Sequence, residues 1–289
     1  MSRIYPIIMT QLKFTHQDNL TYPYNDRGMQ FGDGIYEVIR VYEGHCYLLD
    51  EHIDRLFRSA EAIKINLPFT KDEIKNNLTD LLKRNHMSRD GKIYLQITRG
   101  AAQRSHAFPE NITPNIYAYV KNLPRNEDYL KNGISTITAR DERWENCYIK
   151  SLNLLPNVLA KQEAREKGCY EAILHRDGTV TEGSSSNIFL VKEGKIYTHP
   201  ATKRILHGCV RAAVIRLASA LNIEVIEKAF EVEDIPYADE MFLTSSTSEV
   251  LPIIKVDNTT IGDGKPGAIT RKLQEAYEQD AQIKQRVFQ

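Results

Sequence analysis

The sequence has few of the residues that metal centres and disulfide frameworks need. It contains four cysteines in 289 residues, Cys46, Cys147, Cys169 and Cys209. They are widely spaced, and no two of them form a CxxC pair. A metal site or a set of disulfides is therefore not expected, and the thiols are typical of a reduced compartment.

Net charge and long apolar runs are also missing. The 38 basic and 38 acidic residues cancel, so no bulk field favours nucleic acid or an anionic membrane. No apolar run approaches the length of a membrane span. The first residues lack the long apolar core and small-residue cleavage site of a signal peptide. We expect a soluble, cytoplasmic protein with neither nucleic acid nor membrane as a partner.

Two common catalytic fingerprints are absent as well. No GxGxxG follows an expected strand, so the dinucleotide-binding motif is missing. No GxSxG elbow is present, which leaves an α/β-hydrolase without support. The chain also has no internal repeat and no low-complexity segment.

The apolar patterns and helix signals of the sequence predict two domains of the α+β class. Residues 1–120 read as a small N-terminal domain with an opening strand in 4–14 and helices over 51–65 and after Thr70. Thr70 and Glu73 match the capping box that begins a helix. The polar stretch 121–133 is the expected linker, and 134–289 the larger C-terminal domain.

The C-terminal half has more strands than helices. Asp177-Gly178 and Glu193-Gly194 lie between apolar runs and predict two tight hairpins. Helices are expected over 155–168, over 208–221, and from about 266 to the end. Strands that arrive as hairpins favour a twisted antiparallel, barrel-like sheet over a parallel one.

Lys150 lies inside the apolar run YIKSLNLL. A buried ammonium loses its proton easily, and a neutral lysine amine attacks carbonyl groups. Three further lysines, Lys64, Lys92 and Lys255, also border apolar residues, so local context alone does not select Lys150.

Two polar segments in the second half suggest ligand binding. The run TEGSSSN, residues 181–187, carries Glu182 before three serines and fits either a solvated turn or a carboxylate partner for a cofactor nitrogen. Gly208 opens an expected helix, whose first amides make an anion site or simply an ordinary helix start.

Other candidates are weaker when taken one at a time. The hydroxyls of residues 244–248 would bind a phosphate or form a serine/threonine turn. Arg55 on the 51–65 helix is a bidentate phosphate partner or a solvated surface residue. Arg104 and His106 would grip a carboxylate or belong to a plain surface loop.

Together these segments resemble one enzyme family. Residues 182–189 match the pattern E-x-S-x-x-N-aliphatic-F, and Thr198, Gly208 and Arg211 continue it. DRGMQFGDGIYE, residues 26–37, matches the N-terminal motif. The chain resembles the fold-type IV pyridoxal-phosphate enzymes, the class IV aminotransferases, over essentially its whole length. Within them YIKSLNLL, EKGCYEAILHR and Arg104-Ser105-His106 are most similar to the D-amino-acid aminotransferases.

The resemblance implies a role for each matching residue. Lys150 would carry pyridoxal 5'-phosphate as a Schiff base and move the proton, while Glu182 would pair with the pyridine nitrogen. The remaining cofactor-binding positions are Arg55, Leu206, Cys209, Val210, Ser245 and Ser246, and the substrate-binding positions are Tyr36, Tyr94, Arg104, His106, Ser185 and Thr247. Val210 replaces a threonine of a relative, and the lost hydroxyl predicts phosphate binding weaker by about 0.5–1.5 kcal/mol.

The resemblance implies ping-pong transamination from D-alanine to 2-oxoglutarate, giving pyruvate and D-glutamate. It also implies a homodimer, in which Arg104 and His106 reach the partner's site, and a pseudo-barrel C-terminal domain. A branched-chain L-aminotransferase, an aminodeoxychorismate lyase of the same fold and a non-catalytic binding module remain as alternatives.

Overall fold

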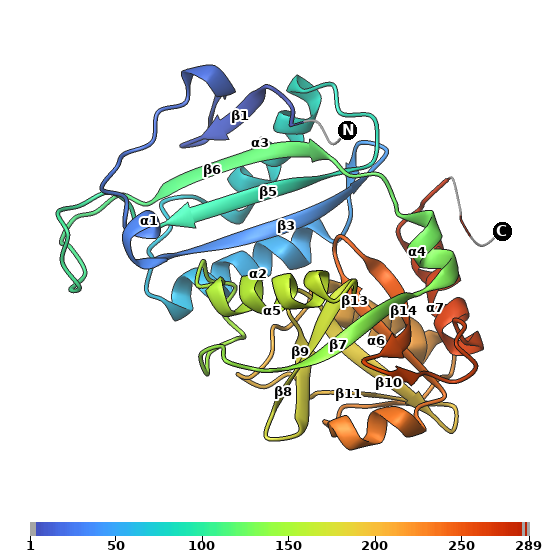
Figure 1. Cartoon of the computed structure of the whole chain (residues 1–289). Helices are drawn as coiled ribbons and strands as arrows, with labels where there is room; N and C mark the ends of the chain where they lie inside the picture. Colours follow the sequence, from blue (N-terminus) through green and yellow to red (C-terminus); the bar gives the residue numbers. More distant parts are fainter. Residues whose placement is uncertain (1–3, 285–286, 288–289) are drawn as a thin grey trace. The chain divides into compact units, whose positions relative to one another are not determined.

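The computed structural model describes residues 4–284 and 287, and its chain divides into two compact units. Unit 1 holds Met1–Pro124 together with Ile149–Asn153, and unit 2 holds Arg125–Tyr148 and Leu154–Gln289. Each unit has helices and its own sheet (Figure 1). No helix among the described residues is long and apolar enough to cross a membrane.

Unit 1 is a six-stranded sheet in the order β2-β1-β6-β5-β3-β4, with every pairing antiparallel. The strands are β1 Ile7–Thr10, β2 Lys13–His16, β3 Gly34–Tyr42, β4 His45–Cys46, β5 Gly91–Thr98 and β6 Asn115–Asn122. The helices are α1 Arg27–Phe31, α2 Leu49–Ala62 and α3 Lys71–Arg84, with a short 3-10 turn η1 at Gln17–Asn19.

The core of unit 1 lies between this sheet and helices α2 and α3 (Figure 1). In β5, Ile93, Leu95 and Ile97 are buried and alternate with Tyr94 and other more exposed side chains, the period-2 pattern of a strand with one face on a core. The capping box of α3 is confirmed: the Thr70 hydroxyl accepts from the Glu73 amide, and the Glu73 carboxylate accepts from the Thr70 amide.

The opening of the chain differs from the single strand predicted for residues 4–14. It forms the β1–β2 hairpin, which turns at Gln11 and Leu12 with φ of 49° and 54°. Such left-handed turns usually carry glycine or asparagine, so this sequence gives no turn signal. The alternation continues through the turn and reads as one strand.

Unit 2 contains a nine-stranded sheet, in the order β12-β11-β10-β13-β14-β7-β8-β9 with β15 added on β14. The strands are β7 Ile134–Arg140, β8 Glu171–Arg176, β9 Thr179–Gly183, β10 Asn187–Lys192, β11 Lys195–Thr198, β12 Val225–Ile226, β13 Glu240–Ser245, β14 Glu249–Val256 and β15 Thr259–Thr260. The helices are α4 Glu127–Asn132, α5 Leu155–Glu166, α6 Cys209–Ala220 and α7 Ala268–Asp280, with a 3-10 turn η2 at Val232–Tyr237.

Both predicted hairpins are present in unit 2. Asp177 and Gly178 join β8 to β9, and Glu193 and Gly194 join β10 to β11, all four with positive φ. The sheet is nevertheless mixed rather than antiparallel throughout, because β7 pairs in parallel with both β8 and β14, and β11 pairs in parallel with β12. Parallel strands need a long crossover connection, and the one between β7 and β8 contains α5. This helix matches the one predicted over 155–168.

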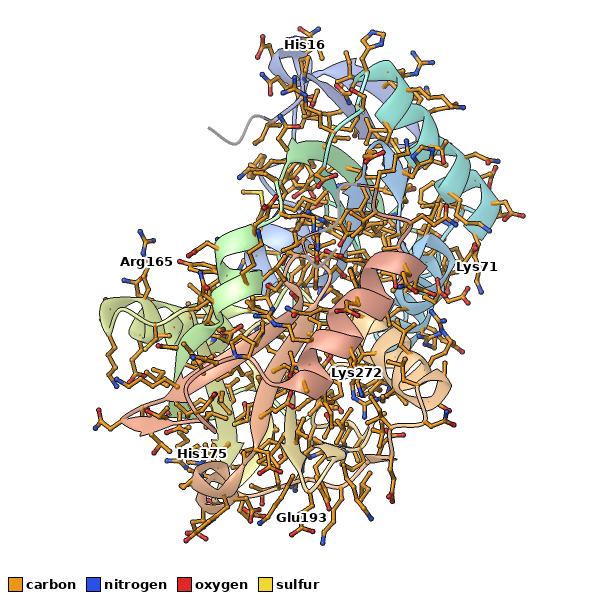
Figure 2. The ribbon with its side chains drawn as sticks, turned by 90° about the vertical axis from the view of Figure 1, so that its right-hand side faces the viewer. His16, Lys71, Arg165, His175, Glu193 and Lys272 are labelled. Atoms are coloured by element: carbon orange, nitrogen blue, oxygen red, sulfur yellow. The ribbon has the colours of Figure 1, made fainter. Side chains whose placement is uncertain are left out.

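The last helix of the described residues is α7, whose buried face includes Leu273 and Tyr277 and whose outer face carries Lys272 (Figure 2). The helix was predicted to reach the end of the chain, but it stops at Asp280 and a turn follows. Residues 285, 286, 288 and 289 lie outside the described part.

The expected linker at 121–133 is folded for much of its length. Strand β6 runs to Asn122, and α4 occupies Glu127–Asn132 inside unit 2. The Asn126 side chain accepts from the Tyr129 amide, and Gly133 ends the helix with a φ of 80°. The polar composition of this stretch suggested a linker, although Asn126 and Gly133 cap an ordinary helix in it. The segment 149–153, which holds Lys150, also returns to unit 1 although a single boundary near residue 120 was expected.

Candidate active site

Lys150 is held at the end of strand β3 in unit 1. The Tyr36 amide donates to the Lys150 carbonyl at 3.0 Å, and the Lys150 amide donates to the Ser59 hydroxyl at 3.2 Å. The side chain is half-buried rather than fully buried, and its Nζ lies 4.3 Å from the centre of the Tyr36 ring. The backbone is thus fixed on both sides while the amine rests on an aromatic face.

Tyr36 and Tyr94 lie side by side on neighbouring strands of that sheet. Their rings stack with centroids 5.9 Å apart, as expected for residues on one face of a β3–β5 pair. The Tyr94 hydroxyl donates to the Gln96 side chain at 2.8 Å, and burial raises the Tyr94 pKa above its usual range. Lys150, Tyr36 and Tyr94 therefore form one cluster within unit 1.

Arg55 lies on the buried face of α2, bound to a carboxylate. Its Nε donates to Glu37 Oε1 at 2.8 Å and its Nη2 to Glu37 Oε2 at 2.7 Å. His52 Nδ1 also lies 2.7 Å from Glu37 Oε2. Burial alone would raise the Glu37 pKa, but the Arg55 guanidinium and His52 hold it far below the usual range. Arg55 is therefore not a solvated surface residue, because its guanidinium is buried and bound to the Glu37 carboxylate.

Arg104 and His106 lie on an exposed loop of unit 1 that has neither helix nor strand between residues 102 and 114. Both contact the same ring. The Arg104 guanidinium lies 5.0 Å from the centre of Phe31, and the His106 ring meets Phe31 edge-on at 5.5 Å. The structure thus brings these two predicted trap residues together.

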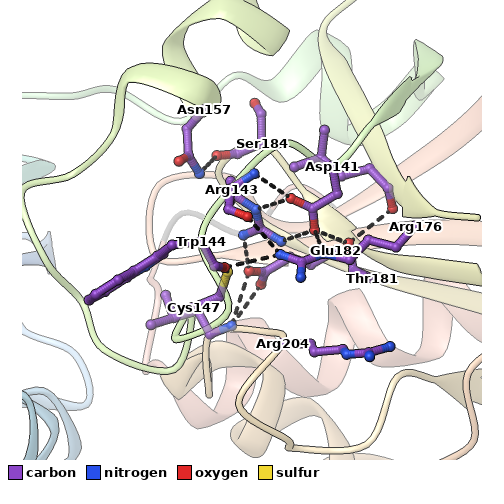
Figure 3. Close-up of polar contacts among 12 residues, drawn as sticks. Asp141, Arg143, Trp144, Cys147, Asn157, Arg176, Thr181, Glu182, Ser184 and Arg204 are labelled. Carbon is purple, nitrogen blue, oxygen red and sulfur yellow. Dashed lines mark hydrogen bonds and ion pairs between the residues drawn. The ribbon is translucent and has the colours of Figure 1, made fainter. Parts of the chain in front are cut away.

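In unit 2, Glu182 is the acceptor of a buried cluster (Figure 3). Its carboxylate accepts from Arg143 Nη1, from Asn187 Nδ2 at 2.9 Å, and from the Leu206 amide at 3.0 Å. Burial raises the Glu182 pKa, and the neighbouring Arg143 guanidinium only partly offsets this. Glu182 is thus buried and hydrogen-bonded, and does not lie in the solvated turn that was one alternative for this segment.

Arg143 serves two carboxylates at once. Its Nε and Nη2 donate to Asp141 at 2.9 and 2.8 Å, while its Nη1 donates to Glu182. Asp141 also accepts from the Thr181 hydroxyl at 2.9 Å and lies 3.3 Å from Arg176 Nε (Figure 3). These contacts keep the Asp141 pKa, which burial would raise, down at about 2.

The three serines after Gly183 share one buried acceptor, Glu171. Ser184, Ser185 and Ser186 all donate to its carboxylate, Ser185 at 2.8 Å and Ser186 at 3.1 Å. Ser185, predicted to bind substrate, is therefore placed on Glu171 in this structure.

Helix α6 begins where Gly208 packs on Asn187. A Cβ added to Gly208 would lie 2.1 Å from Asn187 Oδ1, so glycine is required there by close approach. No side chain caps the helix, whose first two residues are Cys209 and Val210, both buried. Asn187 also donates to the Leu206 carbonyl at 2.9 Å. Leu206 and the helix start are thereby tied to Glu182.

The hydroxyl run after β13 forms a turn bound to itself. Ser245 Oγ accepts from the Ser248 amide at 3.0 Å and lies 3.4 Å from the Thr247 hydroxyl. Ser246 is half-buried in the same turn. Thr244 Oγ1, by contrast, is buried and has no hydrogen-bond partner among the described residues.

Four residues that hold these clusters together were not singled out from the sequence: Glu37, Asp141, Arg143 and Glu171. Asp141 and Arg143 belong to the charged stretch DERWE that follows β7. An Asp-x-Arg pair directly after an apolar strand is the available signal for these two. The signal is weak, because charged stretches are usually solvated.

Comparison with known proteins identifies the family. Residues 34–256 match the family model described as amino-transferase class IV. A D-alanine aminotransferase of Bacillus licheniformis is 49% identical over 253 residues, covering 88% of this chain and 89% of that protein. One from Staphylococcus haemolyticus is 45% identical over 266 residues, covering 92% and 94%.

Solved structures of related enzymes share the fold. A branched-chain amino acid aminotransferase of Escherichia coli superposes with a TM-score of 0.89 at 26% identity, covering 94% of this chain and 93% of its own. Another branched-chain amino acid aminotransferase, solved with pyridoxamine 5'-phosphate, gives 0.89 at 26% identity, covering 97% and 96%. The family match spans well over half of the chain, and this protein belongs to the class IV aminotransferases.

Proposed function

We propose that this chain is a pyridoxal 5'-phosphate-dependent D-amino-acid aminotransferase that moves the amino group of D-alanine to 2-oxoglutarate. The observation that carries the proposal is the buried Glu182 carboxylate with its three donors. A pyridinium nitrogen needs such a carboxylate to stay protonated. The choice of D-alanine rests on relatives that bear this name at 45–49% identity.

The residues present fit that cofactor. Unit 1 offers an amine, Lys150 Nζ, resting on the Tyr36 ring. Unit 2 offers Glu182, an α6 start that no side chain caps, and the buried Thr244 hydroxyl, which lacks a partner among the described residues. When bound, the cofactor supplies an electron sink that weakens the substrate Cα–H bond.

Each residue then has one task in our proposal. Lys150 holds the cofactor through Nζ, and the same amine, once released, takes the Cα proton and returns it. Glu182 keeps a proton on the ring nitrogen, aided by Arg143, which favours the ionised carboxylate. Phosphate contacts are assigned to Arg55, the amides of Cys209 and Val210, and the turn at Ser245 and Ser246.

Substrate recognition is assigned to a second set of residues. Tyr36, Arg104 and His106 bind the α-carboxylate, and Tyr94, Leu206, Ser185 and Thr247 complete the surroundings. Arg104 and His106 act in the site of a partner subunit, so the active form in this proposal is a homodimer.

The test is a coupled assay with D-alanine and 2-oxoglutarate that measures pyruvate formation. The Lys150→Ala variant should lose at least about a thousand-fold in turnover, because it removes the amine that moves the proton. Lys192→Ala is the matched control, since Lys192 Nζ also lies over a tyrosine ring, 5.6 Å from that of Tyr237. Loss of activity in both variants, or no pyruvate from the wild-type chain, would contradict the proposal.

A branched-chain L-aminotransferase is the second candidate, because solved structures with that name share the fold. Activity on L-leucine without activity on D-alanine would select it.

The dimer has its own test. Lys150→Ala homodimers and Arg104→Ala/His106→Ala homodimers should each be impaired. Mixed dimers should regain one intact site if the loop of one chain completes the site of the other. No recovery on mixing would contradict action across the subunits.

A further inference from the structure

The loop that carries Arg104 and His106 has no regular structure to hold it. Residues 103–108 are all exposed, and no backbone hydrogen bond between two residues of this stretch lies among the contacts of the described chain. A loop of this kind is mobile unless side chains fix its carbonyl groups.

One buried arginine supplies those contacts. Arg27, whose side chain is 3% exposed, donates through Nη1 to the Ser105 carbonyl at 2.6 Å and the Ala107 carbonyl at 3.4 Å. Its Nη2 donates to the His106 carbonyl at 3.5 Å. One guanidinium therefore reaches three consecutive carbonyls, which the fork of arginine permits and a lysine ammonium cannot reproduce.

A second arginine steadies the same support. Asp33 Oδ2 accepts from Arg27 Nε and from Arg99 Nε, each at 2.8 Å. Arg99 also donates to the carbonyls of Ile63 and Lys64, and its guanidinium lies 3.6 Å from the centre of the Phe108 ring. Asp33 thus joins the arginine beneath the loop to one that is anchored at the end of α2.

The ring of Phe31 completes the arrangement. It lies 4.8 Å from the Arg27 guanidinium carbon and also contacts Arg104 and His106. Arg27 thereby sets the backbone of the loop, and Phe31 sets the direction of its two functional side chains. Both come from α1, which the Asp26 side chain caps by accepting from the Gly28 amide.

We propose that Arg27 is a positioning residue for substrate-carboxylate binding, acting through the carbonyls of residues 105–107 and through Phe31. The inference rests on the proposed function, in which Arg104 and His106 bind the α-carboxylate. Both substrates of the reaction carry an α-carboxylate, so a displaced loop weakens the binding of each. Proton transfer at Lys150 does not depend on the loop.

The experiment compares steady-state kinetics of Arg27→Gln with those of the wild type. KM for D-alanine and KM for 2-oxoglutarate should both rise about ten-fold or more, while kcat changes by less than about three-fold. Arg27→Lys should recover only part of the loss. Arg40→Gln is the matched control, because Arg40 is an equally buried arginine of unit 1 that contacts Asp90 and Tyr42 and pairs with Lys92, at the end of β5 opposite to the one from which the loop leaves.

A readout that needs no activity tests the loop directly. Trypsin cleaves after exposed arginines in mobile segments, so cleavage after Arg104 should be faster in Arg27→Gln than in the wild type and in Arg40→Gln. Should Arg27→Gln fail to fold, Phe31→Leu takes its place. It keeps apolar volume at the half-buried ring and is expected to raise both KM values.

The outcomes separate the two proposals. If Arg104→Gln raises both KM values and neither Arg27→Gln nor Phe31→Leu does, positioning by Arg27 is overturned and the function stands. If the wild-type chain shows no transamination, the proposed function fails. Unchanged tryptic cleavage in Arg27→Gln overturns the role of Arg27 in holding the loop whether or not the enzyme is active.

Discussion

Glu37 in unit 1 and Glu182 in unit 2 are both buried carboxylates that face an arginine, yet their pKa values move in opposite directions. Glu37 accepts from the Arg55 guanidinium through two nitrogens, and His52 lies against the same carboxylate. Glu182 shares Arg143 with Asp141, whose negative charge lies close by. Both carboxylates are buried, so the charges around each one, and not burial alone, set the direction of its pKa shift.

The difference suits two separate tasks. A carboxylate that is fully compensated is a structural anchor, and Glu37 fixes α2 to β3 in this way. A carboxylate that is only partly compensated retains affinity for a positive group. Glu182 has this character, which is what a partner for a protonated ring nitrogen needs.

The largest change in stability is expected on replacement of Glu37. Glu37→Gln should lower the free energy of unfolding by about 3–5 kcal/mol, because it leaves the Arg55 charge buried without its carboxylate. Urea denaturation at pH 7 measures this, with Glu51→Gln on the exposed side of α2 as the control. A loss no larger than that of the control would show that Glu37 is not an anchor.

At Glu182 the same change should act on turnover instead. Glu182→Gln is expected to lower kcat about a hundred-fold or more, since an amide cannot hold the ring nitrogen protonated. The free energy of unfolding of the cofactor-free protein at pH 8 should fall less than it does in Glu37→Gln, because folding raises the Glu182 pKa and so does not favour its ionised form. Equal stability losses in Glu37→Gln and Glu182→Gln would remove the distinction.

The stability that Glu37 contributes should also depend on pH. A pKa lowered by folding stabilises the protein above the unfolded value of about 4.3, and this contribution is lost as the pH falls through the folded pKa. The stability difference between wild type and Glu37→Gln should therefore shrink below about pH 4.5. Thermal melting from pH 7 to pH 3 would show it, and a difference that grows on acidification would reverse the sign argued here.

The smallest expected effect concerns Asp141. Its charge adds to the rise in the Glu182 pKa, so Asp141→Asn should lower that pKa while keeping an acceptor for Arg143. Carbon-13 NMR of the glutamate carboxyl carbons in the cofactor-free protein can follow the titration. A Glu182 pKa that stays in place or rises would show that Asp141 acts by holding Arg143 and not by its charge.

Local signals in the sequence predicted local structure well. The Thr70 capping box and the hairpins at Asp177-Gly178 and Glu193-Gly194 depend on residues close together in the chain, and all three are present. The Gln11-Leu12 turn was missed because residues that do not favour it occupy it, held by the pairing of β1 with β6.

Long-range partners were harder to predict. Motif resemblance singled out Glu182, whereas no motif pointed to Arg143, which lies 39 positions earlier. Arg27 likewise contacts residues 78 to 80 positions away, and the spacing of apolar residues along the sequence cannot predict such contacts. Such pairs depend on which strands become neighbours, and only the tertiary structure gives that.

The return of residues 149–153 to unit 1 also bears on how the protein is made. During synthesis the sheet of unit 1 has all its strands once residue 122 has emerged, but the segment that binds along β3 has not yet been translated. The 29 residues 125–153 take roughly 1.5–6 s at ordinary translation rates. For that interval the nascent β3 end, where Gly34 and Tyr36 later pair with the lysine segment, is open to other chains. The residue on which catalysis is proposed to depend is thus also the one whose arrival closes the first unit.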